Sequence, residues 1–151
     1  MSFSCEVETV FARTALFASL TRSERRRLAS LATTRTYPAG TTILRQGDTS
    51  MAVYMILSGR VAVQVGAQRV REIGADGFFG ELGVIDDNPR SASIVALEPT
   101  RCALLATWDV RDNARIAMSL LPILAQRLRE AHTREPRSEA DWIATVMGET
   151  V

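Results

Sequence analysis

Apolar positions recur at helical spacing near both ends of the chain and follow a different pattern in the middle. Residues 6–34 have a helical pattern, in which the first part carries the apolar residues Phe11, Leu16, Phe17 and Leu20 and the second part has Leu28 and Leu31 on one face. The helical period returns from Asp109. The apolar stripe that follows is formed by Ile116, Leu120, Leu121, Leu124 and Leu128. We expect it to pack mostly against the core, with a helix break at Pro122 and a fresh helix to about residue 135.

Between residues 37 and 106, glycines separate short runs rich in valine, isoleucine and threonine. Strands are predicted at 41–44, 53–57, 60–65, 69–73, 91–97 and 101–106. Turn signals at intervals of about 8–12 residues indicate a small barrel or jelly roll. Gly40, Gly47 and Gly59 are expected at turn positions that need a positive φ.

The length of 151 residues fits one domain with a sizeable core. Within it we predict an N-terminal helical segment at 1–36, a β-barrel at 37–107, C-terminal helices at 108–135 and a tail at 136–151. The tail is expected to hold one short helix, at 138–147. The fold class is therefore mainly β with flanking helices.

Composition excludes several classes of function. The chain is 46% hydrophobic and 23% charged, with a formal net charge of +1, so no overall basic field favours nucleic acid. All 18 basic residues are arginine, which excludes Schiff-base chemistry and a phosphate-loop lysine. The Arg25-Arg26-Arg27 run fits a solvated helix face better than a nucleic-acid patch.

The cysteines and the N-terminus indicate a cytoplasmic protein. Cys5 and Cys102 are far apart, and no secretion signal or 18-residue apolar run accompanies them. Both are expected to be free thiols, with Cys102 a small buried side chain. No membrane association is predicted.

The strongest chemical signal is the segment Phe79-Gly80-Glu81-Leu82, followed by Arg90-Ser91-Ala92. Glycine lets a backbone approach a phosphate closely, and backbone N–H groups attract an anion. An arginine adds a charge-assisted grip, while a carboxylate can accept a hydrogen bond from a sugar hydroxyl. The alternatives are a surface ion pair for Arg90 and a structural carboxylate for Glu81.

These residues resemble the phosphate-binding cassette of the cyclic nucleotide-binding domain, found in bacterial cAMP receptor proteins, kinase regulatory subunits and cyclic-nucleotide-gated channels. Further matching pieces precede the cassette in the family's order: Leu16-Phe17-Ala18-Ser19-Leu20, Pro38-Ala39-Gly40, Gln46-Gly47-Asp48, and Tyr54 with Leu57-Ser58-Gly59-Arg60-Val61. The resemblance covers residues 15–135 and implies a β-roll with N-terminal helices and C-terminal lid helices.

The resemblance also implies ligand-binding roles at matching positions. Glu81 would accept from the ribose 2′-hydroxyl, while Arg90, helped by Ser91, would hold the cyclic phosphate. Backbone groups in the cassette would complete the cradle; they belong to Gly80, Leu82, Gly83 and Ala92. Val63 would lie under the base, and Arg127 is placed to cap it. Ser91 favours cAMP, because cGMP-preferring relatives tend to carry threonine there, although cGMP stays open.

Two departures from the family affect the expected output. The segment after Val110 is shorter than usual, which leaves the lid register and the role of Arg127 open. Only 15 residues follow Pro136, too few for a winged DNA-binding module, so DNA binding is not expected. We predict a sensor that moves its C-terminal helix to signal to a protein effector, with a homodimer through that helix as an option. The alternatives are a non-binding interaction module and the regulatory part of a transcription regulator.

Catalysis and metal binding are not predicted. Metal-dependent barrel enzymes need several clustered ligands, and His132 is the chain's single histidine. No nucleophile has a positioned base, and two cysteines cannot hold an iron–sulfur cluster. Asp86-Asp87-Asn88 fits a solvated turn better than a metal run. No cofactor is expected besides the cyclic nucleotide ligand.

Overall fold

The computed structural model describes residues 3–49, 51–80 and 89–133. Helices precede and follow an eight-stranded barrel, in the order α1 (Phe3–Arg13), η1 (Ala15–Phe17), α2 (Arg22–Leu31), β1 (Thr33–Tyr37), β2 (Thr42–Leu44), β3 (Ala52–Ser58), β4 (Arg60–Val65), β5 (Gln68–Gly74), β6 (Phe78–Phe79), β7 (Ser93–Ala96), β8 (Thr100–Ala106), α4 (Thr107–Arg111) and α5 (Ala114–Thr133). The architecture is the mainly-β roll that the sequence predicts.

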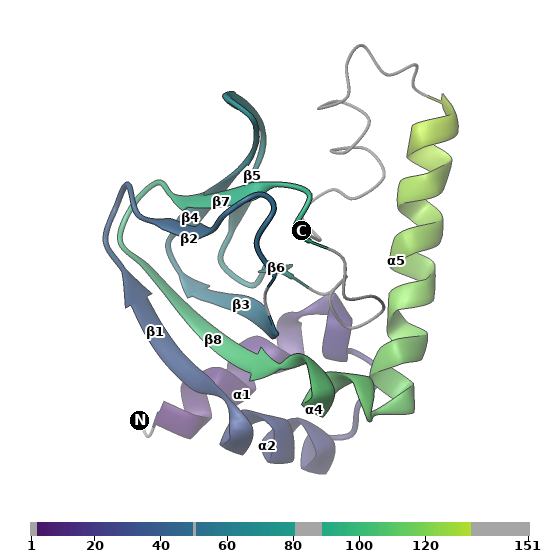
Figure 1. Ribbon diagram of the computed structural model, residues 1–151. Helices are drawn as coiled ribbons and strands as arrows, with labels where there is room; N and C mark the ends of the chain where they lie inside the picture. The colour runs from purple at the N-terminus through teal and green to yellow at the C-terminus, as the bar shows by residue number, and fades with distance from the viewer. Residues whose placement is uncertain (1–2, 50, 81–88, 134–151) are drawn as a thin grey trace.

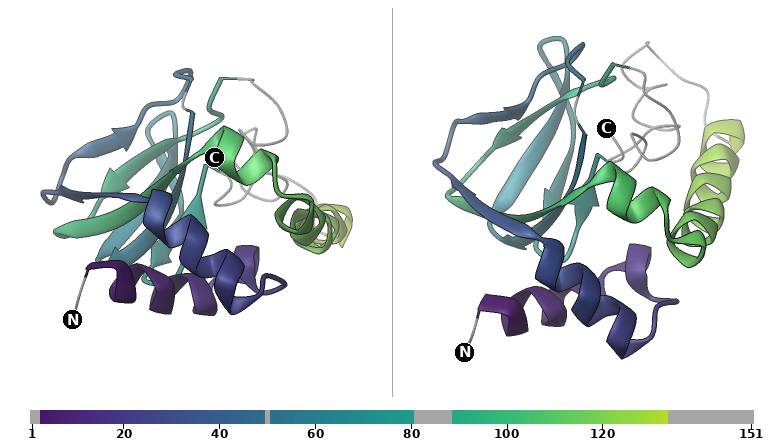
Figure 2. Two further views of the ribbon diagram at one scale, coloured as in Figure 1. Left: turned by 90° about the horizontal axis from the view of Figure 1, so that it is seen from below. Right: turned by 60° about the horizontal axis from the view of Figure 1, so that its bottom comes forward.

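Two four-stranded antiparallel sheets form the barrel. One has the order β1-β8-β3-β6 and the other the order β2-β7-β4-β5. Figure 2 shows the two layers, with α1 and α2 beneath the first sheet and α5 standing beside the barrel. The six predicted strands are all present, each within two residues of its expected ends.

The central strand β3 of the first sheet is buried on both faces, which explains its continuous apolar sequence. In β3, Val53 and Met55 belong to a core shared with the N-terminal helices, while Tyr54 and Ile56 belong to the core between the sheets. Alternation of period two therefore sends successive residues into two different cores. The buried thiol of Cys102, on β8, lies in the core between the sheets, as predicted.

The strand β1 corrects the helical prediction for residues 6–34, because helix α2 ends at Leu31 and the chain turns directly into β1. It also places the start of the barrel before residue 37. This strand pairs only with β8, at the edge of its sheet, and its sequence Thr-Thr-Arg-Thr-Tyr contributes no fully buried residue. It therefore lacks the apolar alternation that marks a strand. The short strand β6 was also not predicted.

Helix α5 corrects the predicted break, since it runs through Pro122. Ile116 is fully buried and Ile123 packs against the same core. These two residues are seven positions apart, so they lie on one helix face and hold both sides of the proline in place. Leu121 is 55% exposed. The helix packs mainly against η1 and α4 rather than the strands, as Figure 1 shows.

Tight turns close the barrel where glycines were expected. Gly40, Gly47 and Gly59 have φ values of +85°, +90° and +101°. At Gly59 a Cβ would lie 2.5 Å from Thr100 Oγ1, so a side chain would clash as well as strain the backbone. This turn brings β3 and β4 into adjacent sheets.

Candidate functional site

Arg90 is a buried cation at the end of the barrel. Only 5% of the residue is exposed, and its Nη1 donates to the carbonyl of Gly80 at 3.2 Å. Its backbone is held on both sides, because Gly47 N–H donates to Arg90 O and Arg90 N–H donates to Asp48 O, each at 2.8 Å. A guanidinium fixed in this way can offer charge-assisted hydrogen bonds to an anion that reaches it.

Gly80 is at a position that only glycine suits. Its φ is +86°, and a Cβ there would lie 2.9 Å from Ala52 O and 3.8 Å from Arg90 Nη2. The backbone of the cassette thus approaches both β3 and the guanidinium closely. The missing side chain thus makes room for the backbone of β3, and the expected approach to a phosphate stays a prediction.

Ser91 and Ala92 continue from Arg90 toward β7. Ser91 Oγ is buried and has no hydrogen-bond partner among the described residues, and Ala92 is fully buried. Buried hydroxyls are normally satisfied, so this one is suited to receive a ligand atom. The structure thus brings Gly80, Arg90, Ser91 and Ala92 together, whereas Glu81, Leu82 and Gly83 lie outside the described residues, as do Asp86, Asp87 and Asn88.

The predicted base-facing residue Val63 lies in the wall of the barrel. It is 1% exposed and shares the inter-sheet core with Ile94, Ala92 and the stacked rings of Tyr54 and Phe79, whose centroids are 4.8 Å apart. Apolar side chains therefore line the wall of the barrel next to the buried guanidinium of Arg90. Arg127 belongs to α5, but its side chain is outside the described part, so its capping role stays a prediction.

Sequence reasoning missed the anchoring of the site by the turn after β2. Besides the Gly47 and Asp48 contacts, Gln46 N–H donates to Ser93 Oγ at 2.8 Å, and Gly66 N–H donates to Gln46 Oε1 at 2.9 Å. The turn therefore joins β7 to the β4–β5 hairpin. The motif Gln46-Gly47-Asp48 was visible in the sequence, but nothing there indicated these long-range hydrogen bonds.

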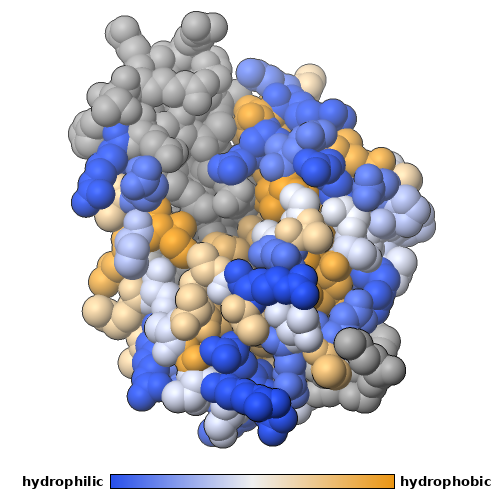
Figure 3. Space-filling model, turned by 180° about the vertical axis from the view of Figure 1, so that it is seen from behind, coloured by the Kyte–Doolittle hydropathy of each residue, from blue (hydrophilic) through white to orange (hydrophobic). Residues whose placement is uncertain are grey.

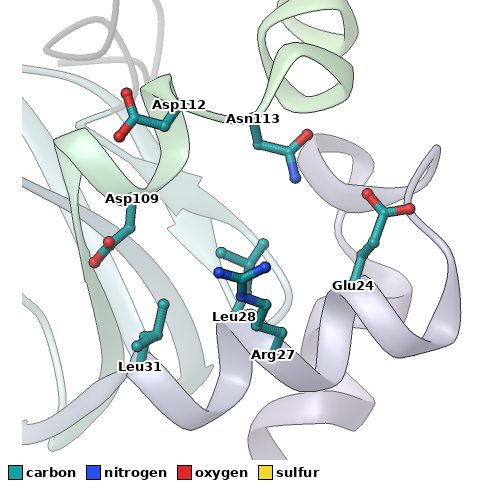
Figure 4. A pocket seen from close by; sticks show the side chains of 7 residues that line it. All are labelled: Glu24, Arg27, Leu28, Leu31, Asp109, Asp112 and Asn113. Carbon is teal, nitrogen blue, oxygen red and sulfur yellow. The ribbon is translucent and has the colours of Figure 1, made fainter.

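A second recess, shown in Figure 4, lies between α2 and the junction of α4 with α5. Arg27 points into it, and Glu24, Asp109 and Asp112 line its sides. Glu24 forms a capping box with Thr21: the backbone N–H of Thr21 donates to Glu24 Oε1, and the backbone N–H of Glu24 donates to Thr21 Oγ1. The pKa of Glu24 is lowered chiefly by the hydrogen bond from the Thr21 backbone. No cluster of three metal-ligating side chains occurs within residues 3–49, 51–80 and 89–133.

Contacts at this junction hold α5 to the N-terminal helices. Ser19 and Ser119 share a hydrogen bond of 2.7 Å, and Arg115 Nη1 donates to Glu24 Oε1. Asn113 Oδ1 accepts from the backbone N–H of Arg115 at 3.0 Å and so caps the start of the helix. Farther along, Met118 is 63% exposed. A homodimer through this helix stays a prediction.

The face of the molecule opposite to that in Figure 1 has a mixed surface. Seen from behind, hydrophilic and hydrophobic side chains are interspersed over the molecule (Figure 3). Within the described part of the chain, no helix is both long and apolar enough to cross a bilayer. Arg26 pairs with Glu8 at 3.4 Å, which supports a solvated role for the arginine run.

Comparison with known proteins agrees with this geometry. The family model for the cyclic nucleotide-binding domain matches residues 34–112, just over half of the chain. The chain is 38% identical over 106 residues to the cyclic AMP receptor protein of Thermus thermophilus, covering 64% of this chain and 49% of that protein. It is 35% identical over 108 residues to a cAMP-dependent protein kinase regulatory subunit of Blumeria graminis, covering 69% and 28%.

The fold comparison agrees. The crystal structure of Thermus thermophilus catabolite activator protein superposes with a TM-score of 0.71 and 35% identity, over 80% of this chain and 61% of that one. The chain spans about half of the matched receptor protein and about a quarter of the matched regulatory subunit. With a family model over most of the barrel and a buried cassette arginine in place, the chain belongs to the cyclic nucleotide-binding domain family.

Proposed function

We propose that this chain is a sensor that binds a cyclic nucleotide through Arg90 and catalyses no reaction. The observation that carries the proposal is the burial of Arg90 at 5% exposure, on a backbone held by Gly47 and Asp48. A cyclic phosphate has one negative charge that this guanidinium can neutralise. The names of the two relatives, a cyclic AMP receptor and a cAMP-dependent kinase regulatory subunit, support a ligand of this class.

The neighbouring groups complete a phosphate site. Ser91 Oγ is available to donate to a phosphate oxygen, and Gly80 places no side chain beside the Arg90 guanidinium. On the sequence resemblance, Glu81 would accept from the ribose hydroxyl. This grip is the same for cAMP and cGMP, because both carry the same ribose phosphate.

The proposed output runs through α5 to a protein effector. Two residues separate the end of α4 from the start of α5, and α4 directly follows β8 in the chain. It is tied to the N-terminal helices by the Ser19–Ser119 and Glu24–Arg115 contacts. A ligand that favours one position of α5 would shift its population, and an effector that holds α5 would change ligand affinity by the same factor.

The test is Arg90→Ala, measured by titration calorimetry with cAMP and cGMP. Loss of a buried charged partner costs about 2–5 kcal/mol, which is roughly two to three decades in the dissociation constant. We therefore expect micromolar binding to disappear. Arg45→Ala is a matched control, since Arg45 is exposed beside the same turn and its loss changes the charge equally. Near-wild-type binding by a folded Arg90→Ala variant would refute the proposed site.

A further inference from the structure

Helix α5 has a second row of apolar residues on the side away from the core. Ile116 and Ile123 hold the inner side of the helix against the core shared with the N-terminal helices. The outer stripe repeats at helical spacing and is formed by Ala114, Met118, Leu121, Pro122 and Ala125. Met118 and Leu121 are 63% and 55% exposed. Large apolar side chains that gather on one exposed face indicate a surface that another element covers.

The outer stripe borders a groove between α5 and the turn that follows η1. The groove has a volume of about 440 Å³ and is lined by Ser19, Ala114, Arg115, Met118, Ser119 and Pro122. Its two sides are tied together, because Ser19 and Ser119 share a hydrogen bond of 2.7 Å. A preformed groove beside exposed apolar side chains suits an amphipathic helix that lays its apolar face against it.

The charges along the outer stripe favour an acidic occupant. Arg115 and Arg129 are about four helical turns apart, so they lie on the same side of α5 near the two ends of the stripe. A second α5 that crosses antiparallel at Pro122 would set Arg115 against Arg129, and a parallel pair in register would set each arginine against its own copy. Like charges at such close range disfavour a second copy as the occupant.

The tail of the chain has the complementary character. Residues 138–151 contain no arginine and three acidic residues, Glu139, Asp141 and Glu149. The helix that the sequence predicts at 138–147 has three apolar residues on one face, Trp142, Ile143 and Val146. This segment lies outside the described residues, so its helix stays a prediction. Its sequence offers an apolar face for the outer stripe and carboxylates for the arginines beside it.

The connection is long enough for this docking. Residue 138 can lie up to about 17 Å from Thr133, because an extended chain spans about 3.5 Å per residue. Ala125, at the near end of the outer stripe, lies about 12 Å back along α5, and packed helix axes are about 8–10 Å apart. These two displacements combine to about 15 Å, which the connection can span. A helix over 138–147 then extends about 15 Å, close to the 16 Å or so of the outer stripe.

We propose that residues 138–147 form a helix that docks antiparallel on the outer stripe of α5, with Trp142 near Leu121 and Val146 near Met118. The short connection gives this segment an effective concentration on the order of millimolar, which a separate partner must exceed. The docked helix would hold the first half of α5 against the turn after η1 and would add to the cost of moving α5. This inference does not depend on nucleotide binding, so it and the proposed function can fail separately.

The experiment measures the rate of disulfide formation between α5 and the tail in the full chain, without nucleotide. Cys5→Ser removes the exposed native thiol, and Cys102 is buried. Met118→Cys combined with Val146→Cys should form a disulfide within one chain under a mild oxidant, identified by mass spectrometry of the linked peptides. The matched control is Ala117→Cys with Val146→Cys, since Ala117 is exposed next to Met118 but does not line the groove. Its disulfide should form about tenfold more slowly.

A charge placed on the outer stripe supplies a second measurement. Leu121→Glu, in the chain that carries the Met118→Cys and Val146→Cys pair, should slow disulfide formation about fivefold or more, because a carboxylate would be buried against Trp142 and beside the acidic tail. The exposure of Leu121 means that this change spares the core, and circular dichroism verifies the fold.

Four outcomes would overturn the inference. They are equal rates for the Met118 and Ala117 pairs, no disulfide in the folded protein, an unchanged rate with Leu121→Glu, and a disulfide that joins two chains. The last outcome would show that a second copy occupies the outer stripe. None of these results would affect binding of cyclic nucleotide at Arg90, which is tested independently by calorimetry.

Discussion

Single residues in the barrel differ in how strongly the fold constrains them. Arg90 is buried and its backbone is hydrogen-bonded on both sides, while Arg71 of the edge strand β5 is exposed. The first arrangement suits a permanent charge that must be in place before the ligand arrives. The second leaves the side chain in contact with solvent, so substitutions at the two positions are expected to differ in their effect on ligand affinity.

Burial also separates the two thiols. Desolvation raises the pKa of Cys102 from an ordinary value of 9.0 to about 12, while Cys5 is exposed. At pH 8 the native protein should therefore react with an aromatic disulfide reagent at one thiol, and at two after denaturation. The raised pKa of Cys102 also makes the stability of the fold depend on pH. An unfolded thiol ionises from about pH 9 while the folded one stays protonated, so Cys102 stabilises the fold below pH 9 and this contribution declines between 9 and 12.

The matched control for this prediction is Cys5→Ser, which should show no reactive thiol in the native state and one in denaturant. Rapid labelling of Cys102 in the folded Cys5→Ser protein would contradict the burial of this side chain.

At the scale of elements, prediction from the sequence was most successful for apolar runs bounded by glycines. Residues 60–65 were assigned correctly to β4, in which Val61, Ala62 and Val63 are all buried. The strand β1 was missed because it is an edge strand of polar residues, held by pairing with β8. The local sequence does not reveal that pairing. It also does not reveal the tertiary contacts that keep α5 helical through Pro122.

Pro122 is therefore a local defect in a helix that packing maintains. Proline has no N–H to donate to the carbonyl four residues earlier, and in a helix interior it costs about 3 kcal/mol relative to alanine. Pro122→Ala should raise the free energy of unfolding by about 1–3 kcal/mol, measured by urea denaturation. Pro38→Ala, in the turn between β1 and β2, should give no such gain. A less stable Pro122→Ala protein would show that the proline fits this helix without cost.

At the scale of the whole molecule, the two cores are joined by β3 and β8. Val53 and Ala103 face the N-terminal helices, whereas Tyr54 and Cys102 face the core between the sheets. Since Ile116 of α5 belongs to the first of these cores, a change at the barrel interior has a packed route to the helix. The proposed output therefore does not require direct contact between the ligand and α5.

Ligand should accordingly change the hydrogen exchange of α5. We expect the amides of residues 116–133 to exchange at a different rate when the wild type is saturated with cyclic nucleotide, because the ligand would shift the helix between positions. Mass spectrometry after proteolysis measures this. The Arg90→Ala protein with the same nucleotide is the control and should show no change. Equal exchange in α5 with and without ligand, at confirmed saturation, would argue against transmission through this helix.

Much of the candidate site could be predicted because the cassette is nearly contiguous in the chain. Gly80, Arg90 and Ser91 were identified from residue type and spacing, and the structure brings them together. The direction of the Arg71 side chain could not be predicted, because the face on which it lies depends on a bulge and on the register with β4. Side-chain direction in a bulged strand is a property of the pairing, not of the local sequence.

The hydrogen bonds between Arg90 and the Gln46-Gly47-Asp48 turn have a consequence for protein engineering. A chimera that transplants only residues 80–92 into another barrel would leave the arginine without its backbone partners at Gly47 and Asp48. A transplantable unit of this domain must therefore include two separate pieces of chain, the cassette and the turn after β2. Biosensors assembled from the cassette alone should respond weakly even when every ligand-contacting side chain has been carried over.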